Sequence, residues 1–236
     1  MAPRVSLVST VTQVIYLVIP PSEDLGGQAN AGRSWAKAQD TIERSAGFLR
    51  LYWGRRLEEP DNVQLHIVRK TLQQHEDFLK SPLYQNELLP IFNTLTEAST
   101  PSPHIPKLFI RHAYLQDFTQ DCKALGKAPG MPIGTAIYLD TDDTWDEGAW
   151  PLWTHVVRHV DGCRGVSGGK LVEPVAEYER NYLVYVGWES VEKHDNYHHT
   201  KHFANRRIIL ALGNKGWREY GHIVFEGGRE QTSASL

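Results

Sequence analysis

The side chains best suited to acid–base chemistry gather in one stretch, residues 187–203. This stretch holds four of the eleven histidines and a tyrosine, namely His194, Tyr197, His198, His199 and His202. A histidine carries protons near neutral pH, and a tyrosine hydroxyl can polarise a carbonyl or hold an enolate. Such a pair suits cyclisation, dehydration, decarboxylation or isomerisation of a polyketide-like or aromatic substrate, chemistry that needs no cofactor.

The same histidines allow other interpretations. His194, His198 and His202 are four residues apart, which places them on one face of a helix and suggests a metal site. However, no His-Glu-x-x-His pattern is present, so a solvated or pocket-lining cluster is favoured and no metal is expected. His202 could also be a surface residue or a core histidine with a backbone partner. The run Asp140-Thr141-Asp142-Asp143 lacks the other ligands of a calcium loop.

Further candidates lie outside this stretch. Side chains alternate along a strand, so Tyr220 and His222 should share one face of the last predicted strand. His222 and Tyr138 are candidates to line a substrate pocket, as are Trp188 and His194. The alternatives are a hydrogen-bonded structural histidine and a core tryptophan.

Composition excludes several classes of protein. The net charge is −3 and no long basic run occurs, so we expect no nucleic-acid partner, and Arg55-Arg56 and Arg206-Arg207 are interpreted as solvated. No Gly-x-Gly-x-x-Gly, Walker or Gly-x-Ser-x-Gly motif is present. Residues 5–19 are predicted to form a strand, not a signal peptide, and no apolar run is long enough to span a membrane. The two cysteines, Cys122 and Cys163, fit a reducing compartment, so we expect a cytoplasmic protein.

The elements that must position these residues follow from periodicity and turn signals. In the first half the predicted order is strand 10–19, helix 35–45, strands 48–57 and 63–70, helices 72–79 and 81–98, and strand 107–115. Ser34 is the expected cap of the first helix, after a Gly-rich loop. Residues 116–131 look like a linker with a short helix near 117–125.

A similar order then begins again. The predicted elements are strand 134–140, helix 146–160, strands 166–173 and 179–187, a helical stretch 190–211 and strand 217–225, followed by a frayed tail from Gly227.

The two halves can be aligned as an internal repeat. Residues 75–86 align without a gap to residues 194–205, so His75 corresponds to His194 and Phe78 to Tyr197. Residues 57–60 align with residues 171–174, and His112 with His222. A βαββαβ unit leaves one apolar sheet face bare, and two units in one chain can bury these faces against each other. The prediction is an α+β protein of two tandem ferredoxin-like βαββαβ repeats, residues 1–116 and 133–236 with a linker at 117–132. They would form an intramolecular, pseudo-dimeric α/β barrel in a monomer.

The segments Trp188-Glu189-Ser190-Val191-Glu192, Tyr197 and His202-Phe203 resemble the helix-entry motif of the dimeric α/β-barrel proteins. This group includes stress-responsive barrel proteins, the plant olivetolic acid cyclase and the antibiotic-biosynthesis monooxygenases. Tyr52-Trp53-Gly54 is similar to the second strand of the plant cyclase. The resemblance covers roughly residues 10–115 and 134–226 through short, degenerate motifs.

The resemblance implies that a tyrosine and a histidine on this helix act as acid and base. The tyrosine falls on Tyr197 and the histidine on His202, with His199 as a competing assignment. Phe78 and Leu83 stand at these places in the first half, so the second half is expected to be active. The function expected first is a cofactor-independent enzyme that cyclises, dehydrates or rearranges a polyketide-like or aromatic substrate. The alternatives are a cofactor-free monooxygenase of anthrone-like substrates and a non-enzymatic ligand-binding or stress-response protein.

Overall fold

The computed structural model describes residues 10–97 and 106–231 and shows a mixed α+β fold built on one antiparallel sheet. The sheet has nine strands in the order β4-β1-β3-β2-β9-β6-β8-β7-β5. Residues 5–9, Ala98 and the tail after Gln231, all covered by predictions above, lie outside the described residues.

The N-terminal half contains strands at Val11–Val18 (β1), Phe48–Arg56 (β2), Asn62–Arg69 (β3) and Leu108–Ala113 (β4). Its helices are Asn30–Glu43 (α1), Leu72–Lys80 (α2) and Leu89–Glu97 (α3), with a π-helical turn at Leu83–Leu88 (η1). The predicted order of these elements is confirmed. The helix α1 begins earlier than expected. Its residue Gly32 packs closely against Gly27, since a Cβ at position 32 would lie 2.0 Å from the Gly27 backbone oxygen. The Gly-rich segment therefore enters the helix, and Ser34 does not cap it.

The C-terminal half contains strands at Pro132–Leu139 (β6), Cys163–Lys170 (β7), Asn181–Trp188 (β8) and Trp217–Glu230 (β9). Its helices are Trp150–Val157 (α4), Val191–His198 (α5) and Lys201–Arg206 (α6), with a π-helical turn at Trp145–Ala149 (η2) and a 3-10 turn at Arg207–Ala211 (η3). The predicted frayed tail is wrong up to Glu230, because β9 continues and pairs with β2 over Arg50 to Arg56.

The segment between the halves contains a two-residue strand, Gln116–Asp117 (β5), which pairs with β7. The short helix predicted near residues 117–125 is wrong. Cys122 and Leu125 instead pack into the core, and Asp121 and Leu125 have positive φ, which is incompatible with a right-handed helix.

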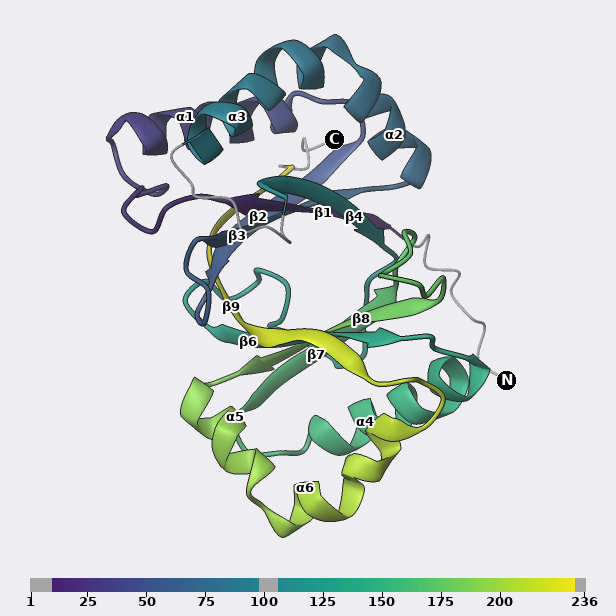
Figure 1. Cartoon of the computed structure of the whole chain (residues 1–236). Coiled ribbons are helices and arrows are strands. Elements are labelled where there is room, and N and C mark those ends of the chain that lie inside the picture. Colours follow the sequence, from purple (N-terminus) through teal and green to yellow (C-terminus); the bar gives the residue numbers. More distant parts are fainter. Residues whose placement is uncertain (1–9, 98–105, 232–236) are drawn as a thin grey trace, which may run out of the picture.

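The ends of the sheet approach each other. An isolated bridge joins Ala113, at the end of β4, to Leu171, just after β7, and the Tyr114 N–H donates to the Lys170 oxygen at 3.0 Å. Figure 1 shows the sheet curving, with α1, α2 and α3 outside one half and α4, α5 and α6 outside the other.

Apolar residues form three cores. One lies between α1, α3 and the N-terminal strands around Trp35, and another lies between the C-terminal strands and α4–α5 around Trp150. The third lies on the concave face of the sheet and combines side chains of both halves, such as Val14, Tyr52, Tyr185 and Phe225. Strand alternation explains the division, because Val14 and Ile15, neighbours on β1, belong to different cores.

The helical stretch predicted over residues 190–211 is broken. The helix α5 ends at His198, and the Thr200 side chain then accepts a hydrogen bond from the Phe203 N–H at the start of α6. The row of histidines four residues apart is therefore interrupted between His198 and His202.

Candidate functional site

A cavity lies between the C-terminal sheet and its helices. It has a volume of about 580 Å³, within the range typical of small-molecule sites. Most of its wall is apolar or aromatic, including Tyr138, Trp150, Trp153, Trp188, Tyr197, Phe203, Trp217 and Tyr220. His194 and His198 also line it, and Arg207 is the one Lys, Arg, Asp or Glu side chain among its lining residues.

A chain of hydrogen bonds runs from this cavity to the other half of the protein. The Nδ1 atom of His194, on α5, lies 2.7 Å from Nε2 of His222, on β9. The Nδ1 atom of His222 lies 2.6 Å from a carboxylate oxygen of Glu58, which follows β2. The second Glu58 oxygen accepts the His222 backbone N–H at 2.8 Å. The carboxylate is thus fixed by two bonds to one residue of the other half.

These contacts assign the tautomers of both rings. Because the Glu58 carboxylate only accepts hydrogen bonds, Nδ1 of His222 must carry a proton. With both imidazoles neutral, its Nε2 has a lone pair, which accepts the Nδ1 proton of His194. The Nε2 atom of His194 is then left unprotonated, and among the described residues it has no hydrogen-bond partner. A bare imidazole nitrogen on a residue that lines the cavity is a candidate general base.

Two neighbours hold His194 in this position. The Trp188 indole stacks on its ring with centroids 4.5 Å apart and planes 16° apart. Gly134, on β6, leaves room for the His194 ring, because a Cβ at position 134 would lie 2.9 Å from Cε1 of His194. A side chain at position 134 would push the imidazole away from His222.

The lowered pKa of His194 explains why proton uptake there would be coupled to His222 and Glu58. Burial lowers the pKa of His194 to about 3, with further lowering from His198 and His222, so an isolated imidazole here would be a weak base. A proton taken up at Nε2 can be matched by release of the Nδ1 proton to His222. The positive charge then sits beside Glu58. Burial raises the pKa of the Glu58 carboxyl, but the hydrogen bonds from His222 outweigh this and hold the pKa below its usual value. Since Glu58 is 45 % exposed, protons can leave to solvent there.

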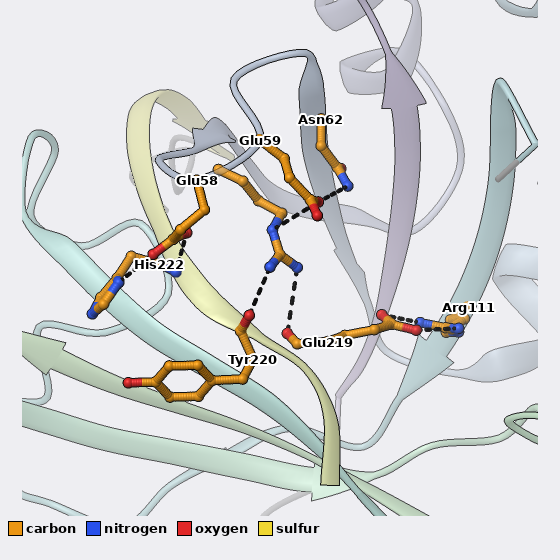
Figure 2. A network of polar contacts seen from close by, with 8 residues as sticks. Glu58, Glu59, Asn62, Arg111, Glu219, Tyr220 and His222 are labelled. Carbon is orange, nitrogen blue, oxygen red and sulfur yellow. Dashed lines mark hydrogen bonds and ion pairs between the residues drawn. The ribbon is translucent and has the colours of Figure 1, made fainter. Parts of the chain in front are cut away.

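The relay is braced by further polar contacts, which Figure 2 shows around Glu58, Tyr220 and His222. Arg56, interpreted from sequence as solvated, is buried, and its guanidinium donates to the backbone oxygens of Glu219 and Tyr220 at 3.3 and 2.9 Å. The Glu219 carboxylate, at a residue with φ of 55°, accepts two bonds from Arg111 at 2.7 and 2.8 Å. Residues of the N-terminal half therefore hold the start of β9 at Glu219 and Tyr220.

Similar contacts occur around His112 in the N-terminal half. Its Nδ1 lies 2.5 Å from a Glu173 oxygen, and its backbone N–H donates to the other oxygen at 2.6 Å. Here, however, the Gln13 amide donates to Nε2 of His112 at 3.1 Å. Gln13 pairs with His112 across the sheet as Gly134 pairs with His222.

Both ring nitrogens of the neighbouring His75 also have hydrogen-bond partners. Its Nε2–H donates to the Val11 oxygen at 2.9 Å, and its Nδ1 accepts from Arg69 at 3.0 Å. Both ring nitrogens of His75 and His112 are thus bonded inside the protein. Phe78 is packed in the adjacent apolar core, with Leu83 against it. The N-terminal histidines therefore have a structural role.

The residues predicted from sequence fall into two groups. Tyr138, Trp188, His194 and Tyr197 line the cavity, and His222 lies behind His194. His202 lines a separate pocket of about 540 Å³ on the outer side of α5, and its Nδ1 is 3.3 Å from the Tyr197 hydroxyl. His199 is exposed at the end of α5, and it lines neither pocket. Within residues 10–97 and 106–231, no group of three His, Cys, Asp or Glu side chains is placed to hold a metal ion.

The sequence analysis did not identify Glu58 or Gly134 as residues of the site. A signal existed for Glu58, because residues 57–60 were aligned with residues 171–174. That alignment is one residue out of register. The N–H groups of Leu57 and Val172 donate to the backbone oxygens of His222 and His112, so Glu58 corresponds to Glu173. A shift by one residue in the alignment placed Val172 opposite the carboxylate.

The mixed α+β fold is ferredoxin-like, as in the similar solved structures. No protein-family model matches the sequence, and a comparison with curated proteins gives no match. Within the described residues, no helix has both the length and the apolar character needed to cross a membrane.

Three solved structures illustrate the similarity. An anthrone oxidase-like protein aligns with a TM-score of 0.67 at 11 % identity, covering 96 % of both chains. A candidate monooxygenase from Fusobacterium nucleatum aligns with a TM-score of 0.59 at 9 % identity, covering 94 % of this chain and 95 % of its own. Chlorite dismutase from Candidatus Nitrospira defluvii aligns with a TM-score of 0.52 at 11 % identity, covering 93 % and 92 %. At these identities the similarity is one of fold.

Proposed function

We propose that the protein is a cofactor-independent enzyme that removes a proton from an activated carbon of an aromatic, polyketide-like substrate and lets the carbanion react with dioxygen. The observation that carries this proposal is the Glu58–His222–His194 relay, which ends at a cavity lined by aromatic side chains. Proton removal is the step that the geometry serves directly.

In this mechanism His194 Nε2 takes the proton, and the relay moves positive charge toward Glu58. Burial raises the pKa of Tyr220 to about 12, so its hydroxyl stays protonated and can donate to a developing oxyanion. An activated methylene then reacts with one O2. A C–O bond forms to give a hydroperoxide, a second proton leaves carbon, and the O–O bond breaks to yield a carbonyl and water. The four electrons lost by carbon reduce both oxygen atoms, so no external reductant is needed.

The comparisons favour oxygenation over the cyclisation expected first from the sequence. The fold neighbours include an anthrone oxidase-like protein and candidate monooxygenases. Anthrone-like ketones have an acidic methylene next to aromatic rings, and this matches a base in an aromatic cavity. The neighbours support this choice at the level of fold.

We also propose that the chain is a tandem duplication, with repeats at residues 1–116 and 133–236 and a linker at 117–132. The strand orders β4-β1-β3-β2 and β9-β6-β8-β7 support it, as do the matching contacts of Glu58 and Glu173. The bridge between Ala113 and Leu171 supports closure of the curved sheet into a barrel. Since both halves share the concave core, the chain can function as a monomer.

The test compares two variants, His194→Gln and His202→Gln, with wild type in an oxygen-electrode assay on anthrone. If His194 is the base, His194→Gln should lower the rate at least a hundredfold, whereas His202→Gln should stay within about threefold of wild type. Circular dichroism establishes that both variants are folded.

Other results would assign a different function. A large loss in His202→Gln alone would move the base to the outer pocket, as the family resemblance implies. Substrate conversion without oxygen uptake would support a cyclase or isomerase. Ligand binding by wild type without any turnover would favour a non-enzymatic binding protein, and unchanged turnover in His194→Gln would refute His194 as the base.

A further inference from the structure

Charge is distributed unevenly around the cavity. Between Asp195 and Glu219 the chain has no acidic residue, although the whole protein has a net charge of −3. This segment carries five basic residues, Lys201, Arg206, Arg207, Lys215 and Arg218. It forms α6, η3 and the start of β9, which contribute Phe203, Arg207, Leu210 and Trp217 to the cavity wall.

Arg207 is distinguished from the other basic residues of this segment. It alone among them lines the cavity, and within the described residues it has neither an ion pair nor a hydrogen-bond acceptor. Within the described residues Lys201, Arg206 and Arg218 also lack an ion pair, and Lys215 pairs with Asp140 at 2.8 Å, but none of these four lines the cavity. No carboxylate lines the cavity to neutralise Arg207.

The cavity also has two chemically different ends. Trp188, beside His194, is 1 % exposed, whereas Trp217 is 58 % and Tyr220 is 41 % exposed. Arg207 is exposed like these two. The base therefore lies at a dry, uncharged end, and the unpaired cation lies at the open end.

We propose that Arg207 is a subsite for an anionic group, a carboxylate, on an otherwise apolar aromatic substrate. This proposal rests on the proposed function for the aromatic part of the ligand. A guanidinium presents parallel N–H donors that match the two oxygens of a carboxylate, and an exposed carboxylate keeps part of its hydration at the mouth. The opposite end of the substrate would reach His194, so Arg207 fixes which carbon is presented to the base.

The experiment measures binding without turnover, using quenching of tryptophan fluorescence. The probes are anthraquinone-2-carboxylate and 2-(hydroxymethyl)anthraquinone, which share the ring system and differ in charge. The proteins are wild type, Arg207→Gln, Arg207→Lys and the neighbouring control Arg206→Gln. We expect wild type to bind the carboxylate about fivefold more tightly than the alcohol at low salt. Arg207→Gln should lose this preference, Arg207→Lys should keep only the part that depends on charge, and Arg206→Gln should keep most of it.

Each outcome is decisive. Equal binding of both probes by wild type would overturn the proposal, as would an equal loss of preference in Arg206→Gln and Arg207→Gln, because that pattern indicates a diffuse positive field. Failure to bind either probe would reject the aromatic ligand and the subsite together. Selective binding that depends on Arg207, combined with no oxygen uptake, would instead support the subsite and refute the oxygenase.

Discussion

Replacing Glu58 by glutamine tests whether a residue outside the cavity controls the base inside it. The carboxylate accepts both the Nδ1–H and the backbone N–H of His222, at 2.6 and 2.8 Å. A glutamine amide has one acceptor oxygen and one donor nitrogen, so it cannot satisfy both donors. If its NH2 group faces Nδ1, that nitrogen must lose its proton. His222 then carries its proton on Nε2 and donates to His194, whose own proton moves to the nitrogen that should act as base.

The expected magnitude follows from this change of tautomer. The productive tautomer becomes the minor one, and the negative charge that stabilises a protonated His222 is gone. General-base catalysis contributes on the order of 10²- to 10⁴-fold, so we expect kcat to fall within that range. Glu58 does not line the cavity, and KM should therefore change less than about threefold.

The assay is steady-state oxygen uptake on anthrone, with Glu59→Gln as the matched control. Glu59 is the next residue of the same loop and lies 3.5 Å from Arg56, without contact to His222. Its substitution should leave kcat within about twofold of wild type, because the Glu59 side chain is half exposed and contacts neither His222 nor the cavity. An equal loss of kcat in both variants would refute the relay, since it would indicate general damage to the loop. A change confined to KM would refute it as well.

Two further predictions follow from the buried histidines and the glycine beside them. Gly134→Ala should lower kcat at least tenfold while the protein stays folded, because the new Cβ would lie 2.9 Å from His194 Cε1. The control Gly148→Ala, whose new Cβ would have no atom within 4 Å, should leave oxygen uptake unchanged. Retained activity in Gly134→Ala would mean that the His194–His222 bond is dispensable. Burial lowers the pKa of His66, His75 and His194 from 6.5 to about 3 each. Below pH 6.5 these histidines therefore bind protons in the unfolded chain but not in the folded protein. Stability is therefore retained above pH 6.5 and lost as the pH falls toward 3, by about 2 kcal/mol for each histidine between pH 7 and pH 5. Urea unfolding at both pH values should show a loss smaller by about 2 kcal/mol in His66→Gln, and an identical loss in that variant would contradict the burial argument.

Much of the fold could be predicted because its signals are local. Strand alternation and the turn signals that bound the elements depend on residues close in sequence. The errors lie where tertiary contacts decide. Residues 227–230 look like a polar tail, yet they form strand because β2 offers an unpaired edge. Likewise, the break before α6 depends on the Thr200 cap, which competes with a helical pattern that continues through it.

The site was predictable only in part, for a physical reason. His194, Tyr197 and His222 could be identified because their side-chain types suggest acid–base chemistry. Which histidine faces the cavity depends on the break after His198. Which nitrogen of His194 is free depends on the contact between His222 and Glu58, which are 164 residues apart in sequence. Gly134 contributes by lacking a side chain, which composition alone does not mark as functional.

The hydrogen bonds that join Glu58 to His222 and Glu173 to His112 connect the two halves of the chain, and they limit how one half can change without the other. Each half supplies the carboxylate of the other half's histidine. A fragment holding residues 132–231 would keep the cavity, His194 and His222, yet lose the charge that sets their protons. Under the proposed mechanism, loss of the N-terminal half, although its own histidines are fully bonded, would therefore also remove the base of the C-terminal half. The proposed activity would belong to the joined halves and not to either one alone.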